Sequence, residues 1–353
     1  MTSFNWILIF LNLNFLAPLV TANTLEESAQ LPEIKPTKTP NFKIGVLFAI
    51  LTLIAISTQP IISEKRSGDL YAIFYAFTTV LFENILILPL MITQTASRRR
   101  SNPGILKTTI KKHWWRFLII GFVFAGAQIL FFWGFDISGE SAAVSGSIAM
   151  KSSIVFTLII GWIFLKEKGS VIQLIFTAVI FVGLFYTLTS GTFKPGEINY
   201  GTLILFTMPI LWTIGHSLTK PLLQQELIVP SQIIYIRTLI STVVLGIFTF
   251  ILNPLSDIML FFNWNNLLFM FLISLSYAVG HYGWYTSIKN IDLALSSAIQ
   301  APQPILTSIL ALIFLGNTLE LYHYVGLTVI FLSILVILYD KQRLSKQRKK
   351  KTI

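Results

Sequence analysis

The stretch FDISGESAAVSGSIAMKSSIVFTLIIGWIF at residues 135–164 returns in altered form as YTSIKNIDLALSSAIQAPQPILTSILALIF at residues 285–314. The two copies align without a gap at an offset of 150 residues. Identical residues occur at Ser147/Ser297, Thr157/Thr307, Ile159/Ile309, Ile163/Ile313 and Phe164/Phe314. About 20 apolar residues cross a bilayer core of about 30 Å, and each copy is long enough to do so. Duplicated membrane-spanning segments are typical of transporters.

The composition of the whole chain indicates an integral membrane protein. Hydrophobic residues make up 54% and charged residues 12%, whereas soluble chains carry about 25% charged residues. Apolar runs predict ten core helices, which are 43–63, 71–93, 116–135, 142–165, 171–190, 200–219, 231–252, 265–288, 293–315 and 322–339. The expected fold is therefore one all-α membrane domain with two five-helix halves, residues 43–190 and 200–340.

The distribution of Lys and Arg sets the expected orientation. If the helix at residue 43 starts in the cytoplasm, 21 Lys and Arg face inward and three face outward. Short loops rich in Lys and Arg stay in the cytoplasm, so we expect a multi-pass plasma-membrane protein with a cytoplasmic C-terminus. The basic tail 341–353 then anchors on the anionic leaflet, and nucleic-acid binding is not expected. Its KKTI ending resembles an endoplasmic-reticulum retrieval signal, but that compartment is less favoured.

The N-terminal segment 1–42 divides into two parts. Residues 5–22 are apolar, but they lack a positively charged start and contain Asn12 and Asn14, which fits a signal peptide poorly. Cleavage there would also invert every later loop against the charge count. The segment is then either an extra hydrophobic helix with its N-terminus outside or an interfacial helix. We expect the extra helix, followed by a flexible linker over 23–42.

An odd number of helices per half predicts an inverted repeat. With five helices each, the second half must enter the membrane from the opposite face if the halves share a fold. Secondary transporters use this arrangement and bind substrate near the midplane between the repeats.

Several segments resemble the EamA family of the drug/metabolite transporter superfamily. Residues 142–168, which end in FLKEK, are similar to the end of the EamA domain, and residues 293–318, which end in FLGNT, are similar to its second copy. ISTQPIISEKR (56–66) and WTIGHSLTKPLL (212–223) are placed like the first and sixth helices of that family. The usual acidic FLGE ending reads Gly316-Asn317 here, so no role for that carboxylate is carried over.

The resemblance implies a ten-helix carrier that moves a small polar or amphipathic metabolite by alternating access without ATP. The chain contains no GxxxxGK[ST], HExxH or GxSxG motif and no cysteine. We therefore expect neither an enzyme nor a bound cofactor or metal. The partners expected are the lipid bilayer and the metabolite, and a homodimer is compatible with the sequence.

Lys151 is the first candidate for substrate binding or coupling. It lies nine residues into the predicted fourth helix, hence about 13–14 Å deep at 1.5 Å per residue. A lysine at that depth costs about 2.5–3.5 kcal/mol. Glu83, about 18 Å deep in the second helix, is the expected partner. Either the pair is purely structural, or Lys151 handles substrate or protons.

Segment 144–151 (VSGSIAMK) also resembles the fourth-helix lysine segment of plastid phosphate translocators. That family binds phosphate with a further Lys-Arg pair in the ninth helix. Here the equivalent residues are Gln300-Ala301-Pro302, which carry no charge. Phosphorylated substrates are therefore disfavoured.

The predicted ninth helix contains two prolines that serve as candidate hinges, Pro302 and Pro304. Each removes a helical hydrogen bond and frees a backbone carbonyl, which is tolerated at that depth only against protein or water. Ser297, Gln300 and Pro304 share one face of this helix, and that face is expected to line a cavity opposite Ser147 and Lys151. Gln303 is a further candidate for substrate binding. A simple structural kink is the alternative.

Polar and aromatic residues on two further helices complete the candidate site. Tyr277 and His281 share a face of the eighth helix, and Gln128 lies in the third. Such faces stack planar or apolar substrates and cations, although aromatic residues are also common near bilayer interfaces. His216 and Arg237 are interpreted as anchors at the cytoplasmic side, with Arg237 able to snorkel.

Two other classes of protein remain open at this point. A non-transporting receptor or scaffold would use a Lys151–Glu83 pair only to lock its bundle. A membrane enzyme would need Glu83, His281 and Lys151 in one water-accessible cluster.

Overall fold

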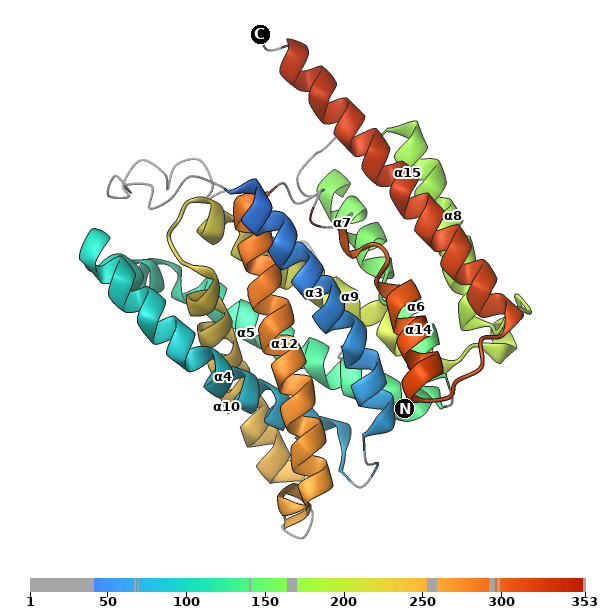
Figure 1. Ribbon diagram of the computed structural model, residues 1–353, viewed down its shortest axis with the longest axis horizontal. Coiled ribbons are helices and arrows are strands. Elements are labelled where there is room, and N and C mark those ends of the chain that lie inside the picture. The colour runs from blue at the N-terminus through green and yellow to red at the C-terminus, as the bar shows by residue number, and fades with distance from the viewer. Residues whose placement is uncertain are drawn as a thin grey trace.

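A computed structural model describes residues 41–66, 68, 70–139, 141–163, 170–252, 259–291, 296 and 299–351. Within these ranges all regular structure is helical (Figure 1). The main helices are α3 (Phe42–Lys65), α4 (Ala72–Ser101), α5 (Ile105–Ser138), α6 (Ala142–Ala149), α7 (Ser152–Ile163), α8 (Val171–Leu188), α9 (Tyr200–Gln224), α10 (Pro230–Leu252), α12 (Trp264–Asn290), α14 (Gln303–Phe314) and α15 (Leu321–Lys351). The extra helix and linker predicted within residues 1–40 lie outside the described part.

Eight of these helices are long and apolar enough to cross a membrane: α3, α4, α5, α8, α9, α10, α12 and α15. The other two predicted crossings correspond to α6 with α7 and to α14, which are shorter apolar helices. Large apolar side chains are exposed on the outside of the bundle, for example Leu47, Phe122 and Ile251. In a bilayer such side chains contact lipid tails, so the all-α, multi-pass membrane fold expected from the sequence is confirmed.

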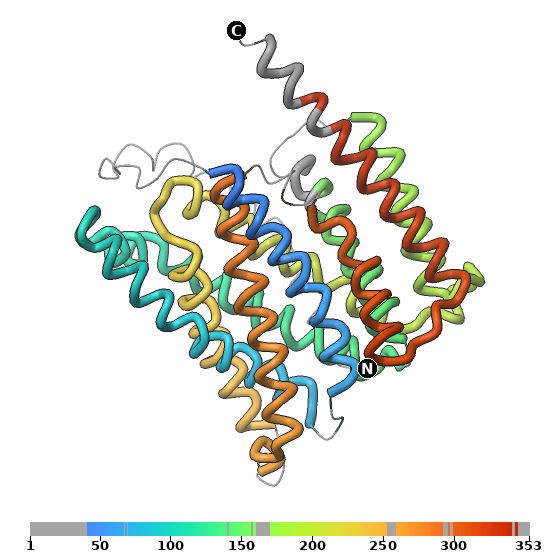
Figure 2. The backbone as a smooth tube through the Cα atoms, in the orientation of Figure 1, coloured from blue at the N-terminus to red at the C-terminus, as the bar shows by residue number. Residues whose placement is uncertain are grey.

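Several predicted helix boundaries were wrong. The basic stretch Arg98–Arg116 was expected to be a loop, but α4 and α5 extend through most of it and leave residues 102–104 between them. The terminal helix α15 continues through the basic tail to Lys351. Before the tail it runs beside α8 (Figure 2). Lys and Arg favour helices, so helices that have left the apolar core can continue into water.

The fourth predicted helix, residues 142–165, is divided into α6 and α7 at Met150 and Lys151. At this division the backbone N–H of Lys151 donates to the Ile148 carbonyl and that of Ile154 donates to the Lys151 carbonyl. These i to i+3 bonds tighten the turn in the manner of a 3₁₀-helix, a feature common where a helix carries a functional hinge. The Ser147 hydroxyl also bonds back to the Val144 carbonyl at 2.8 Å, which bends helices.

The packing of the helices relates the two halves by an approximate two-fold axis. The most extensive helix pairs are α3 with α12, α5 with α9, α4 with α10, and α8 with α15. The first helix of each half thus packs on the third helix of the other, and the second and fifth helices pack on their own counterparts. The fourth helices also meet, through α6 and α14. Reciprocal contacts of this kind are what two-fold symmetry produces. With five crossings in each half, this relation makes the repeat an inverted one.

Glycines allow close approach at the two symmetry-related crossings. A Cβ on Gly201 of α9 would lie 2.4 Å from the backbone nitrogen of Ser138 on α5. A Cβ on Gly283 of α12 would lie 2.4 Å from the Thr52 hydroxyl oxygen on α3. Small residues at such positions let membrane helices pack backbone to backbone.

Candidate functional site

The side chain of Lys151 contacts the interrupted ninth helix of the opposite half. Its Nζ donates a hydrogen bond to the Gln300 carbonyl at 3.1 Å, and the residue is only 7% exposed. In a continuous α-helix this carbonyl would accept from the N–H of residue 304. That residue is Pro304, which has no N–H. The proline therefore frees the acceptor that the buried lysine uses.

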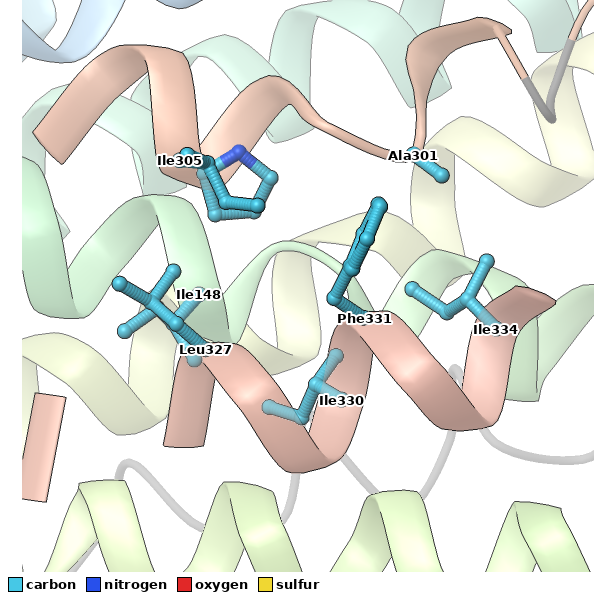
Figure 3. A pocket seen from close by; sticks show the side chains of 8 residues that line it. Ile148, Ala301, Ile305, Leu327, Ile330, Phe331 and Ile334 are labelled. Carbon is cyan, nitrogen blue, oxygen red and sulfur yellow. The ribbon is translucent and has the colours of Figure 1, made fainter. Parts of the chain in front are cut away.

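A small apolar cavity lies next to the ninth-helix residues of this contact. Pro302 precedes α14, and Gln303 and Pro304 form its first turn. Ile148, Ala301, Ile305 and Phe331 are among the residues that line this cavity of about 10 Å³ (Figure 3). A volume of this size holds at most one water molecule. In this state, then, the cavity is too small for a metabolite.

A second group of polar residues lies between α4, α10 and α12. The Oε1 atom of Glu83 accepts from Arg237 Nη2 at 3.2 Å and lies 2.7 Å from His281 Nδ1. Both Glu83 and Arg237 are 2% exposed. Because α4 belongs to the first half and α10 and α12 to the second, this group joins the two repeats. We call Glu83, Arg237 and His281 the buried triad.

Aromatic rings surround the buried triad. The guanidinium carbon of Arg237 lies 4.2 Å from the centre of the Phe124 ring and 5.6 Å from that of Tyr285. Arg237 Nη1 also donates to the Tyr285 hydroxyl at 3.3 Å. That hydroxyl in turn lies 3.3 Å from His216 Nδ1. A guanidinium held against aromatic faces is stabilised by cation–π attraction and keeps a fixed orientation.

Tyr277 and Gln128 extend the group away from the triad. The Tyr277 ring lies 5.2 Å from that of His281, centre to centre, and the side chain of Gln128 lies beside Tyr277. Among the described residues, neither the Tyr277 hydroxyl nor Gln128 Nε2 has a hydrogen-bond partner of good geometry. Unpartnered polar atoms of this kind are rare in protein interiors.

The structure divides the predicted site residues into two groups. Lys151, Gln300 and the hinge Pro304 meet at the crossing of the two interrupted helices, while Glu83, His281, Tyr277 and Gln128 gather around the triad. Ser147 and Gln303 bond to backbone instead, to the Val144 carbonyl and at 3.5 Å to the Ile56 carbonyl. Ser297 lies outside the described residues.

Two predictions about charged partners were wrong. The expected Lys151–Glu83 pair does not form, because Glu83 pairs with Arg237 and His281 and Lys151 reaches the Gln300 carbonyl. Arg237 is not a snorkelling anchor, since it is almost fully buried in the triad. The Glu83–His281 contact that a membrane enzyme would need is present, but Lys151 is bonded in the other group.

Helix α3 runs between the two groups. A Cβ on Gly280 of α12 would lie 3.7 Å from Gln59 Nε2 on α3, so Gln59 lies beside the residue that precedes His281. One turn earlier on α3, the Ile56 carbonyl accepts from Gln303. The next carbonyl, that of Ser57, accepts from Thr307 at 3.1 Å. A movement of α3 would therefore change contacts near the buried triad and near the Lys151–Gln300 crossing.

Sequence reasoning missed a set of contacts at the expected outer end of the bundle. Glu64, at the end of α3, accepts from the backbone N–H of Ala143 at the start of α6. Its other oxygen accepts from Asn317 Nδ2 at 2.8 Å. Asn317 is the residue that replaces the acidic ending of the FLGE motif, and this replacement could have pointed to a nearby carboxylate. We call Glu64, Ala143 and Asn317 the outer latch.

Neighbouring residues of α3 strengthen this region. Arg66 forms a salt bridge with Asp136 of α5 and lies over the rings of Tyr75 and Phe132. Burial lowers the pKa of the Arg66 guanidinium, and the charge of Asp136 partly offsets that effect. Lys65 Nζ donates to the Phe314 carbonyl at the end of α14 at 3.2 Å. Residues 64–66 thus bind α3 to the third, fourth and ninth crossings.

Fold and site together define a helical membrane protein with two inverted five-helix repeats and polar groups buried at their junction. The EamA-like transporter family matches the chain twice, over residues 43–189 and 199–339. The chain belongs to this family. It is also 25% identical over 239 residues to a protein of Bacillus subtilis (strain 168) described as "Uncharacterized transporter YyaM", covering 66% of this chain and 75% of that protein.

One solved structure, titled "Crystal structure of protein", has a similar fold. It superposes with a TM-score of 0.58 at 12% sequence identity and covers 86% of this chain and 99% of that chain. At this identity the similarity concerns the fold alone.

Proposed function

We propose that this protein is a secondary transporter that moves a small polar or amphipathic metabolite by alternating access between its two repeats. The observation that carries the proposal is the contact of Lys151 with the Gln300 carbonyl. It joins a tightened turn in one half to a proline-interrupted helix in the other. Interrupted helices that meet between inverted repeats are where secondary transporters bind substrates and coupling ions.

The two sides of the bundle would open in turn. In the state described, the outer latch and the Arg66–Asp136 pair hold the end that the Lys and Arg distribution places outside the cell. At the other end, Lys289 pairs with Glu226 at 3.5 Å, and Gln94 Nε2 donates to the Tyr282 hydroxyl at 2.7 Å. Each set is small and polar, so a change of a few contacts could open either side while the other stays closed.

The proposed setting is the plasma membrane, with the C-terminal helix ending in the cytoplasm. The bias of 21 inward against three outward Lys and Arg supports this orientation. A purely structural role for the buried charges was the main alternative. It relied on a Lys151–Glu83 pair, and those two residues have other partners.

The test is solute flux in proteoliposomes with the full-length protein, preceded by a ligand-stabilisation screen across amino acids, nucleosides, sugars, phosphates and organic cations. We expect at least one solute to raise the unfolding temperature and to cross the membrane. Lys151→Ala should abolish that flux while insertion and folding are retained. Lys194→Ala, at a 72% exposed side chain outside the bundle, is the matched control. Normal flux in Lys151→Ala would refute the proposed mechanism.

A further inference from the structure

We infer that Arg237 is the anion-binding group of the transport site, and that Glu83 occupies the place of a substrate carboxylate in the state described. The substrate class is then a monocarboxylate with a planar or apolar body. This inference rests on the transport function proposed above and adds the chemistry of the transported molecule.

The contacts of Arg237 leave much of its binding capacity unused. A guanidinium offers five N–H donors in a planar fork that matches a carboxylate with two parallel bonds. Here Nη2 contacts only one oxygen of Glu83, at 3.2 Å, and Nη1 contacts the Tyr285 hydroxyl at 3.3 Å. Among the described residues Arg237 Nε has no acceptor. The pair with Glu83 is therefore one that a better-placed carboxylate could replace.

Glu83 has a second partner to hold it when it leaves Arg237. Its Oε1 atom already lies 2.7 Å from His281 Nδ1, which is shorter than its contact with Arg237. A shift of the Glu83 side chain toward His281 would expose the guanidinium to an incoming anion without leaving Glu83 unpaired. The triad thus has one cation that two carboxylates can share in turn.

Two other buried donors near the triad lack a well-placed acceptor among the described residues, namely Gln128 Nε2 and Trp284 Nε1. The Trp284 ring lies 6.0 Å from that of His216, and Tyr277 lies 5.2 Å from His281. Buried donors without partners favour a ligand that brings acceptors, which a carboxylate does and a cation does not. The aromatic rings of Phe124, Tyr277 and Tyr285 offer faces for a planar body.

The charge of the site favours a monoanion. One guanidinium faces one carboxylate in the triad. A ligand with a single negative charge can therefore replace Glu83 at Arg237 and leave that pairing of charges one to one. A dianion such as a phosphate would need a further cation. The nearest candidate, Lys151, is bonded to the Gln300 carbonyl in the other group.

The experiment measures thermal unfolding of the purified full-length protein with benzoate and 2-naphthoate, and with their amides, benzamide and 2-naphthamide, as matched neutral probes. We expect the carboxylates to raise the unfolding temperature and the amides to have no effect. In Glu83→Gln the competitor is removed, so benzoate should bind at least tenfold more tightly. Lys194→Gln should bind like the unmodified protein.

The double variant Glu83→Gln/Arg237→Gln keeps the test valid if a lone charge prevents folding. Both members of the pair are neutral in it, so it should fold and lose the response to benzoate. The inference is overturned if Glu83→Gln binds benzoate no more tightly, if the double variant still responds, or if the amides or phenyl phosphate stabilise the protein as well as the carboxylates do.

The experiments distinguish a wrong assignment of the anion site from a wrong transport proposal. If the proteoliposomes carry a neutral or cationic solute that depends on Lys151, while benzoate neither binds nor competes, transport stands and the anion assignment is wrong. If neither a solute from the full screen nor benzoate crosses, the transport proposal itself fails.

Discussion

The side-chain nitrogen of Lys151 and the carbonyl oxygen of Gln300 lie 3.1 Å apart, although the two residues belong to opposite halves of the protein. They stand 149 positions apart in a chain whose halves repeat at an offset of 150. The repeats therefore touch each other at nearly equivalent positions, close to the two-fold axis. At this point one copy supplies a charge and the other a free carbonyl.

Replacing Lys151 by Met should separate stability from function. Methionine has a similar length but no charge, and a lysine at mid-membrane depth costs about 2.5–3.5 kcal/mol on insertion scales. We expect the unfolding temperature in detergent to stay the same or rise, and flux to fall at least tenfold. Val171→Met, at a side chain that is 73% exposed, is the control for the added methionine. A variant that unfolds more easily would show that Lys151 mainly stabilises the bundle.

The substitution Pro304→Ala should restore the backbone N–H that the proline lacks. The new N–H can bond to the Gln300 carbonyl, which would extend α14 toward its N-terminus and remove the acceptor of Lys151. We expect slower hydrogen–deuterium exchange across residues 300–306 and reduced flux. Pro195→Ala, in an exposed 3₁₀ turn, should change neither. Unchanged exchange in Pro304→Ala would contradict the assigned role of this proline.

Single substitutions in the buried triad should destabilise the protein far more than the double substitution. Removing one partner of a buried ion pair leaves an uncompensated charge and costs about 3–5 kcal/mol. Glu83→Gln and Arg237→Gln should each lower the free energy of unfolding by about that amount. The double variant should recover at least half of it, as measured by denaturant titration in detergent. Strict additivity of the two losses would mean that the pair contributes no coupling energy.

Asn317→Asp should open the outer latch. It places a carboxylate 2.8 Å from Glu64 where an amide donor stood, and two like charges at that distance repel each other. The chain has no native cysteine, so Ser147→Cys provides a single buried reporter below the latch. A membrane-impermeant thiol reagent added from outside should label this cysteine several-fold faster in the Asn317→Asp background. Asn265→Asp, at an exposed position, should leave the rate unchanged.

The same cysteine-free chain allows the orientation to be measured. Lys194→Cys lies in the connection that the Lys and Arg bias places outside, and Lys107→Cys lies on the expected cytoplasmic side. In intact cells an impermeant reagent should label the first and not the second, and permeabilised cells should show both. The reverse pattern would invert the assigned topology.

Much of the fold could be predicted from the sequence because bilayer thickness sets helix length. The apolar runs identify the crossings, and α3 and α10 begin and end within two residues of the predicted positions. Outside the bilayer, hydropathy does not indicate where a helix ends. The ends of α4 and α15 were therefore placed too early, in basic stretches where hydropathy falls although the helix continues.

The partners of the buried charges were harder to predict, although the depth of each charge in the membrane indicated which residues lie at the same level. Glu83 lies 12 residues from the outer end of its predicted helix, and Arg237 lies about seven residues from the inner end of α10. At 1.5 Å per residue these depths are about 18 and 10 Å, which together nearly span a core of about 30 Å. The two residues were thus at the same level. The proximity of α4 and α10, by contrast, follows only from the two-fold packing.

The reciprocal packing of the halves has a consequence for how the chain is made. Glu83 and Arg237 are 154 residues apart, and synthesis at about 5–20 residues per second separates them by roughly 8–30 s. During that interval the first five helices emerge before the helices on which they mainly pack have been made. Glu83 then has to wait for its partner Arg237. We therefore expect the first half to complete its packing only after the second half has been inserted.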